Sequence, residues 1–534
     1  MIQAPEGQWR PASERRATTN FAADLPVALT AAELRGEGGS PPAHFLLLNT
    51  QQFLYICSPQ ALDREPLRVV DFRSLGASAN GPVFPTCHAH APACADEFDL
   101  AVGLSTGEVV LLSLRAQLRA PASNTRPAAS LCLNVDGCTN ASRCVSLAWL
   151  PGSDGMTFVA AHRDGAVLLY HKVVGSSSDT KLLARSSSQH SLRPPVVHLQ
   201  PPGVGGGATA AAVSPDGQHV AVACKDGVLR VYACPGGGLV AGFKSYYGGL
   251  HCCAWSPDGR YVAAGGEDDL VALYGLAERC VVACCQGHTS WVSCIAFDPW
   301  MCHTDTEQQQ QPGAADAAAA DAADAAAAGA GGGAAAPAAA PALGPGGEER
   351  VYRLASVGQD CQLALWDVVV SEEAVAAAQQ ASSANASPER ERPGLPLSPS
   401  KRRAGGSAAS GSSSGGKADG SPTKRGGGGL GGMFRTRSVG SGAADPGALP
   451  AALAMGLIAP PLPRADWPLV TPVAILKAHP EPASSAAFSA SALFTACHGT
   501  SVRVWARPPL TQAAVVQRID SLQSMDRAQS MDRA

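Results

Sequence analysis

The sequence predicts an all-β fold, a β-propeller, because one unit of paired strands recurs along the chain. Ser214-Pro215-Asp216-Gly217 returns 42 residues later as Ser256-Pro257-Asp258-Gly259. Within each unit the apolar residues alternate, so that Val220, Val222 and Cys224 share one face of a strand. Alternation with a period of two indicates half-buried strands, and a repeat of roughly 40–45 residues is typical of propeller blades.

A second observation is a fixed spacing of six residues between an aspartate and an aromatic residue. It occurs in four units, as Asp164–Tyr170, Asp226–Tyr232, Asp268–Tyr274 and Asp360–Trp366. We expect each aspartate in the turn between the second and third strands, where its carboxylate can accept hydrogen bonds from turn amides and neighbouring side chains. We expect each aromatic ring in the third strand, packed between neighbouring blades.

Composition narrows the class of protein. The chain has 534 residues and a formal net charge of −4, which gives no electrostatic case for a nucleic acid partner. No apolar run approaches the roughly 18 residues of a membrane-spanning helix, and the N-terminus lacks the apolar core of a secretory signal. Several of the 17 cysteines are adjacent or lie within apolar strands, which indicates buried thiols in a reducing cytoplasm or nucleus.

The unit that starts at Gly287 has the fullest set of polar positions. His288 opens it, Ser356 lies in its second strand, Asp360 in the next turn and Trp366 in its third strand. These four residues look like the buried hydrogen-bonded tetrad of a WD40 repeat, which gives His288 a structural role rather than a catalytic one. Without the stretch between about 300 and 350 the unit has ordinary blade length, so we interpret that stretch as a loop insertion.

Changes in composition divide the chain into seven parts. Both inserted regions contain too few large apolar residues to offset the entropy of ordering them, so we expect them to be disordered. Six repeat units and the N-terminal strands predict seven blades, with strands from the two ends of the chain sharing one blade. The parts are a flexible N-terminal segment (1–40), propeller blades (41–300), a disordered Ala/Gly-rich insertion (301–350), the rest of that blade (351–370), a disordered Ser/Gly/Pro-rich basic insertion (371–466), the last blade (467–510) and a C-terminal tail (511–534).

Patterns for catalysis or ligand binding are weak. Gly411 to Lys417 has the spacing of a phosphate-binding loop, but Ala418 stands where a magnesium-binding hydroxyl is needed and no strand or helix flanks it. Cys87-His88-Ala89-His90 with Cys94 could bind a metal, but it lacks the second spaced set of ligands that zinc sites use. We therefore expect no catalytic, cofactor-binding or metal-binding residue and no small-molecule substrate.

Three aromatic residues are candidates for binding a partner. Trp291 lies where the chain enters the first strand of its unit, and Tyr246-Tyr247 occupy the same place in the preceding unit. Aromatic residues at adjacent entries to one face of a propeller, beside two glycines, are typical of a protein-binding hot spot. The alternative is that their rings pack against neighbouring loops.

The second insertion carries candidate regulatory signals. Possible phosphorylation sites are Ser387, Ser398 and Ser421, each followed by proline, and Ser438, which follows a basic pair. Basic clusters at 401–403 and 424–425 are a candidate nuclear-import signal, with a solvated basic linker as the alternative. We expect a cytoplasmic and/or nuclear protein.

Three segments, 243–274, 287–300 and 352–367, together carry one extended motif: the first contains YYGGL and GGEDDL, the second GHTSWV and the third SVGQD. They closely resemble the WD-repeat family that includes animal WD repeat-containing protein 20, the dystrophia myotonica WD repeat protein and the fungal catabolite-repression protein creC. The resemblance covers most of residues 200–370 and extends more weakly to 478–505. The Ala-rich stretch at 311–341 departs from the animal pattern.

The resemblance implies a function that composition cannot show. Members of this family are non-catalytic partners that bind and activate ubiquitin-specific proteases, often with a second WD-repeat subunit. By motif position, Tyr247 and Trp291 are the best candidates for the protease-binding face. The alternatives are a general WD40 scaffold in signalling or trafficking without a deubiquitinase partner, and, less favoured, an enzyme, for which no converging set of acidic or metal-binding residues is visible.

Overall fold

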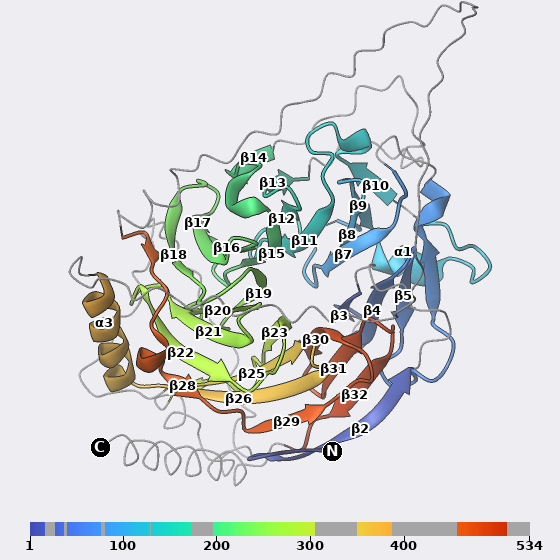
Figure 1. Ribbon diagram of the computed structural model, residues 1–534. Coiled ribbons are helices and arrows are strands. Elements are labelled where there is room, and N and C mark those ends of the chain that lie inside the picture. Colours follow the sequence, from blue (N-terminus) through green and yellow to red (C-terminus); the bar gives the residue numbers. More distant parts are fainter. Residues whose placement is uncertain are drawn as a thin grey trace, which may run out of the picture. The chain divides into compact units, whose positions relative to one another are not determined.

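The computed structural model describes residues 1–15, 27–36, 40–75, 81–94, 96–128, 130–172, 196–304, 350–386 and 456–509. All of these belong to one compact unit, formed by residues 1–386 and 443–534, while the second unit, 387–442, lies outside the described residues. The described strands form seven separate sheets. The fold is therefore a seven-bladed β-propeller, as the sequence predicts (Figure 1).

The first three blades are four-stranded antiparallel sheets, each built from consecutive strands. Blade 1 contains β3 (Ala28–Leu34), β4 (Ala43–Thr50), β5 (Phe53–Cys57) and β6 (Arg68–Asp71). Blade 2 contains β7 (Pro85–His90), β8 (Leu100–Leu104), β9 (Val109–Leu112) and β10 (Ser130–Leu133), with α1 (Leu114–Arg119) between the last two strands. Blade 3 contains β11 (Cys144–Trp149), β12 (Thr157–His162), β13 (Val167–His171) and β14 (Val196–Gln200).

Blades 4 to 6 each combine consecutive strands with one short strand from beyond residue 456. Blade 4 contains β15 (Ala208–Val213), β16 (His219–Cys224), β17 (Val228–Ala233), β18 (Leu239–Lys244) and β27 (Ile458–Ala459). Blade 5 contains β19 (Leu250–Trp255), β20 (Tyr261–Gly266), β21 (Leu270–Gly275), β22 (Cys280–Gln286) and β28 (Leu469–Val470). Blade 6 contains β23 (Val292–Phe297), β25 (Arg350–Gly358), β26 (Gln362–Val370) and β29 (Ala474–Lys477), with β24 (His303–Thr304) paired to β25.

Blade 7 closes the ring with strands from both ends of the chain. It contains β30 (Ala483–Phe488), β31 (Ala492–Cys497), β32 (Val502–Ala506), β2 (Gly7–Arg15) and β1 (Ile2–Ala4). Antiparallel pairing of β2 with β32 joins the two ends, which confirms the expected shared blade. The first strands of the seven blades contact one another in turn, from β3 through β30 and back to β3.

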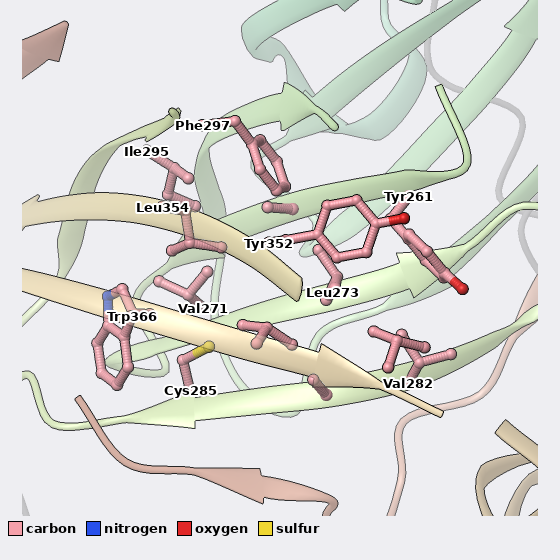
Figure 2. Close-up of a cluster of buried hydrophobic side chains, with 14 of the residues drawn as sticks. Tyr261, Val271, Leu273, Val282, Cys285, Ile295, Phe297, Tyr352, Leu354 and Trp366 are labelled. Atoms are coloured by element: carbon pink, nitrogen blue, oxygen red, sulfur yellow. The ribbon is translucent and has the colours of Figure 1, made fainter. Parts of the chain in front are cut away.

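The apolar core lies between blades rather than within one sheet. The described residues form seven buried clusters, and each cluster combines residues of two neighbouring blades. Figure 2 shows the cluster between blades 5 and 6, where Val271 and Leu273 face Leu354 and Trp366. Because each blade supplies both faces of its sheet to the core, apolar burial on both sides of every blade depends on the ring being closed.

Four of the expected boundaries are wrong where the structure describes them. Residues 2–15 and 28–34 form strands of blades 7 and 1, so these parts of the 1–40 segment are not flexible. Within 371–466, the helix α3 (Glu372–Ala386) packs outside the ring against β22, and β27 pairs in parallel with β18 (Figure 1). Within 301–350, the strand β24 pairs with β25, which begins at Arg350, so these residues are not part of a disordered insertion either. Residues 305–349 and 387–455 and the tail from 511 onward lie outside the described residues.

The fourth correction concerns the last blade. Residues 456–477, which we call the outer strap, run along the edges of blades 4, 5 and 6 before blade 7 begins at β30. Trp467 and Leu462 of the strap are buried in the core cluster shared by blades 4 and 5. The segment 467–510 is therefore blade 7 only from residue 483 onward.

Among the described residues, no helix is both long and apolar enough to cross a membrane.

A buried ionic network ties the N-terminal segment to blade 6. The guanidinium of Arg353 in β25 donates to both carboxylate oxygens of Glu6 and to both of Asp367 in β26, and the side chains of all three residues are at most 1% exposed. Glu6 also accepts from the indole Nε1 of Trp9 at 2.8 Å. Burial raises the pKa of Glu6, but the hydrogen bonds and charge of Arg353 outweigh it and hold the pKa below its ordinary value.

We predict that Arg353→Met lowers the free energy of unfolding by about 3–5 kcal/mol, because it removes the positive charge that compensates two buried carboxylates. Arg73→Met is the matched control: Arg73 pairs with Asp71 at 2.7 Å, but its side chain is 57% exposed. Because this pair is exposed to solvent, its loss should lower the free energy of unfolding far less than the loss of Arg353 does. Urea unfolding of the two variants measures both, and equal losses would contradict a role for the buried network in stability.

Candidate protein-binding face

One face of the propeller carries the loops that precede the first strands and the turns between the second and third strands. We call it the upper face. Four of these turns hold the aspartates predicted from the sequence, and each carboxylate accepts a hydrogen bond from the backbone N–H two residues onward. The bonds join Asp164 to Ala166, Asp226 to Val228, Asp268 to Leu270 and Asp360 to Gln362.

Each turn aspartate also contacts a group outside its own turn. Asp164 accepts from Asn140 at 2.9 Å, and Asp226 forms a two-point ion pair with Arg230 at 2.6 and 3.1 Å. Asp268 lies beside the backbone N–H of Tyr246, in the loop that precedes β19. The aromatic residues six positions later, Tyr170, Tyr232, Tyr274 and Trp366, are all buried. The aspartates therefore connect the turns of the upper face to other parts of the same blade, which are a loop for Asp164 and Asp268 and a strand for Asp226.

The four residues of the expected tetrad form one hydrogen-bonded series in blade 6. His288 Nδ1 lies 2.9 Å from Asp360 Oδ2, and His288 Nε2 lies 2.8 Å from Ser356 Oγ. The indole Nε1 of Trp366 donates to the same Ser356 hydroxyl at 2.8 Å. His288 and Asp360 are buried at 1% and 3% side-chain exposure, so the imidazole has no access to substrate and its position is structural.

A second, shorter series of the same kind lies in blade 7 and is not among the residues predicted from the sequence. His479 Nε2 lies 2.9 Å from Thr495 Oγ1, and the indole of Trp505 donates to the same hydroxyl at 3.1 Å. The hydroxyl and the tryptophan are ten residues apart in both blades, which is the signal that could have found it. The aspartate-to-aromatic spacing overlooks this blade because Gly499 stands at the aspartate position.

The three candidate partner-binding residues lie together on the upper face of blades 5 and 6. Tyr247 is 69% exposed, Tyr246 45% and Trp291 40%. Tyr246 and Tyr247 precede β19, and Trp291 immediately precedes β23, whose strand contacts β19. Gly248 has φ +65°, and a Cβ there would come within 2.5 Å of Glu267, so the loop after the two tyrosines requires glycine.

The outer strap contacts one side of the Tyr246 ring. Its ring packs edge-on against Trp467, with centroids 5.0 Å apart and planes at 88°. Trp467 is itself fixed, because its indole donates to the Leu462 carbonyl at 3.1 Å and Arg464 lies over its ring at 5.6 Å. The alternative that these rings pack against neighbouring loops therefore applies to one side of Tyr246. The contact comes from Trp467, a residue of the strap and not, as the sequence predicts, of the last blade.

Trp291 rests on the imidazole of His251, with ring centroids 5.4 Å apart. Burial lowers the pKa of His251, and its Nε2 lies 3.7 Å from the Glu267 carboxylate, which acts in the opposite direction. Tyr247 is the most exposed large aromatic residue of the described part of the protein and has no aromatic contact there. The group thus presents two supported rings and one freely exposed ring on a single face.

The cysteine- and histidine-rich stretch of blade 2 does not assemble a metal site. Cys87 Sγ lies 3.8 Å from Cys144 Sγ, whereas His88 Nδ1 contacts Asn49 Oδ1 at 2.8 Å and Cys94 contacts Asp96. Across the residues that the structure describes, no group of three or more His, Cys, Asp or Glu side chains could hold a metal ion. Burial raises the pKa of Cys252, Cys253, Cys284 and Cys285, which keeps these thiols protonated and unreactive.

The four possible phosphorylation sites, the two basic clusters and the loop at 411–417 all lie outside the described residues, and they remain predictions from the sequence.

We predict a pH dependence of stability from Asp268. Burial raises its pKa to about 6, although the N–H groups of Leu270 and Tyr246 act in the opposite direction. A raised folded-state pKa means that the folded protein binds a proton that the unfolded protein releases near pH 4, so its contribution to stability is present at low pH and is lost as pH rises from about 4 to about 6.

The free energy of unfolding of the wild type should therefore fall by about 1–3 kcal/mol relative to Asp268→Asn between pH 4 and pH 6.5. Urea unfolding of both proteins across this range measures the difference. A constant difference would show that the carboxyl is ionised at the same pH in the folded and unfolded protein.

The match to a repeat family agrees with this geometry. The family described as "WD domain, G-beta repeat" matches residues 200–233 and 237–274, which carry the Asp226 and Asp268 turns. WD repeat-containing protein 20 of Mus musculus is 32% identical over 292 residues, which cover 53% of this chain and 50% of that protein. A chain of a solved structure described as "Crystal Structure of Mitotic Checkpoint Complex" covers 94% of each chain at 11% identity, with a TM-score of 0.45.

The chain spans about half the length of the curated relative that it matches. The seven-bladed fold, the hydrogen-bonded tetrad of blade 6, the match to the repeat family and the similarity to the mouse protein lead to one conclusion: the protein is a β-propeller that contains WD40 repeats and is similar to WD repeat-containing protein 20 over part of its length.

Proposed function

We propose that this protein is a non-catalytic WD40 scaffold that binds and activates a ubiquitin-specific protease, as the regulatory subunit of a deubiquitinating complex. The observation that carries the proposal is the exposure of Tyr247 and Trp291 on one face. Both lie in the family motif, and the family resemblance implies that these motif positions bind the protease. A second WD-repeat subunit is a further expected partner, and we expect the complex in the cytoplasm, the nucleus or both.

The aromatic group has the physical properties of an anchor for a protein partner. Tryptophan and tyrosine supply large buried areas at low entropic cost, and they dominate binding energies at interfaces. The rings of Tyr246 and Trp291 are already supported by Trp467 and His251, so little conformational freedom is lost on binding. Tyr247 then adds the greatest newly buried surface.

A scaffold of this kind can activate an enzyme without contributing a catalytic group. If the protease alternates between active and inactive conformations, a partner that binds the active one more tightly shifts the population toward it. A preference of a few kcal/mol is sufficient for a large shift. This fits the upper face, where the polar side chains predicted from the sequence are committed to structural hydrogen bonds: His288 and Asp360 within the tetrad, and Asp226 with Arg230.

The second candidate is a general WD40 scaffold in signalling or trafficking that binds other proteins through the same face. The propeller fold favours it equally, because exposed aromatic residues do not specify the partner's identity. The two functions differ in which proteins the scaffold recovers from cells, and they agree that the partner is a protein rather than a nucleic acid, a membrane or a small-molecule substrate.

We predict that the tagged protein recovers a ubiquitin-specific protease in affinity purification with mass spectrometry, and that Tyr247→Ala/Trp291→Ala loses it. Truncating two central aromatic anchors should weaken binding by about 100-fold or more. Trp300→Ala is the matched control, since Trp300 is 42% exposed, close to the 40% of Trp291, and follows β23 where Trp291 precedes it.

Trp300 therefore lies at the opposite end of the same strand, and its variant should keep the protease. Circular dichroism and the unfolding midpoint establish that the double variant is folded. Recovery of other proteins in place of a protease, lost in the same double variant, would favour the general scaffold. Protease recovery that survives the double substitution would place binding on another surface.

A further inference from the structure

The hydrogen-bonded series of blade 7 lacks the carboxylate that completes its counterpart in blade 6. Asp360 lies four residues after Ser356 and six before Trp366, and Gly499 has the same spacing from Thr495 and Trp505. Backbone contacts have the same register: Gln359 N–H donates to Trp291 O at 2.9 Å, and His498 N–H donates to Pro482 O at 2.9 Å. Gly499 therefore occupies the aspartate position of an otherwise preserved tetrad.

The missing carboxylate leaves a buried imidazole nitrogen unpaired. His479 is 1% exposed, and its Nδ1, which corresponds to the atom that contacts Asp360 in His288, has no hydrogen-bond partner among the described residues. Burial is the main cause that lowers the pKa of His479 to about 4, with Arg503 acting in the same direction, so the ring is neutral at pH 7. The Thr495 hydroxyl accepts a hydrogen bond from the indole N–H of Trp505 and can donate one to His479 Nε2. With Nε2 as the acceptor, the proton of the neutral imidazole lies on Nδ1.

His479 and Gly499 line a cavity of about 610 Å³, together with Lys477, Glu481, Ser501 and Arg503, among others. A second buried polar atom that has no hydrogen-bond partner in the described part of the protein, Ser501 Oγ, belongs to the same lining. Arg503 is already engaged, since it pairs with Glu14 at 3.2 Å and donates to the Ala478 carbonyl. Lys477 and Glu481 lie exposed at the rim, so the charges of the lining balance.

We propose that this cavity binds a carboxylate of a partner protein, which takes the place of the absent tetrad aspartate and accepts hydrogen bonds from His479 Nδ1 and Ser501 Oγ. Both unpaired groups act as donors here, and an ionised carboxylate is the acceptor that gains most from two donors in a buried site. Because the charges of the lining balance, the site selects a carboxylate by its two hydrogen bonds and not by a net positive charge. The carboxylate can come from an acidic side chain or from the partner's C-terminus.

The cavity lies on the upper face, one blade along the ring from Trp291. β30 of blade 7 contacts β23 of blade 6 (Figure 1). By its backbone contact with His498, Pro482 has the place in blade 7 that Trp291 has in blade 6. A partner seated on the aromatic group could therefore reach this pocket as well. Both donors belong to blade 7, so they are available to a carboxylate whatever protein occupies the aromatic group.

In the test, saturation-transfer NMR measures the binding of three acetylated tripeptides to the whole protein. Acetyl-Gly-Asp-Gly-amide carries a side-chain carboxylate, acetyl-Gly-Asn-Gly-amide is its uncharged match, and acetyl-Gly-Gly-Gly carries only a terminal carboxylate. We expect at least one carboxylate peptide to bind about tenfold or more tightly than the asparagine peptide, as charge-assisted hydrogen bonds predict. Whichever carboxylate peptide binds identifies the source.

Gly499→Asp supplies the carboxylate from the protein itself and should abolish this binding while raising the unfolding midpoint. The φ of Gly499 is outside the positive range, and the Cβ would come within 3.0 Å of the flexible Glu481 side chain, which can move. Equal affinity for the aspartate and asparagine peptides, binding of none of them, or binding that persists in a folded Gly499→Asp would each overturn the proposal. If that variant does not fold, the peptide comparison on the wild type decides alone.

Discussion

Antiparallel pairing of β2 with β32 is the constraint on which the rest of the structure depends. Every apolar cluster lies between two blades, so a blade without a neighbour would expose one whole face of its sheet. The pairing supplies the final neighbour with residues from both ends of the chain. Glu6 and Arg353 connect the N-terminal segment to blade 6, because the buried carboxylate of Glu6 pairs with Arg353 only when that segment lies against the blade. A closed ring then holds the loops of the upper face in fixed positions.

Much of the fold could be predicted because its determinants are local. The turn aspartates and the aromatic residues six positions later repeat with the blades, and each pair acts within one sheet. The outer strap could not be predicted in this way, because its short strands pair with blades that precede it by some 200 residues in the sequence. Leu462 and Trp467 are apolar, but the Pro-rich sequence around them does not predict a strand, and so it gave no sign that they are buried in the core. The N-terminal strand was missed for a related reason: β2 pairs with a strand almost 500 residues away.

The candidate site shows the same division. Spacing alone indicated His288, Ser356, Asp360 and Trp366, and also the neighbouring loop entries that hold Tyr246, Tyr247 and Trp291. It did not show that Trp467 supports Tyr246 or that His251 supports Trp291, since these contacts join separate parts of the sequence. In blade 7 the departure from the repeat is itself informative, because Gly499 removes a carboxylate and leaves the remaining hydrogen bonds intact. A search for the complete aspartate-to-aromatic spacing therefore overlooks a candidate site that arises because the aspartate is absent.

Hydrogen exchange with mass spectrometry on the wild type and on Trp9→Ala tests most directly whether ring closure maintains the upper face. Trp9 in β2 is fully buried against Phe488 of β30, 6.1 Å between ring centroids, so its truncation weakens closure without touching the aromatic group. If all blades depend on ring closure, amide exchange in Trp9→Ala should be faster than in the wild type in all seven blades, including residues 243–255 and 286–297. Faster exchange confined to residues 1–15 and β30–β32 would show that the blades bearing the candidate site are stable without the closed ring.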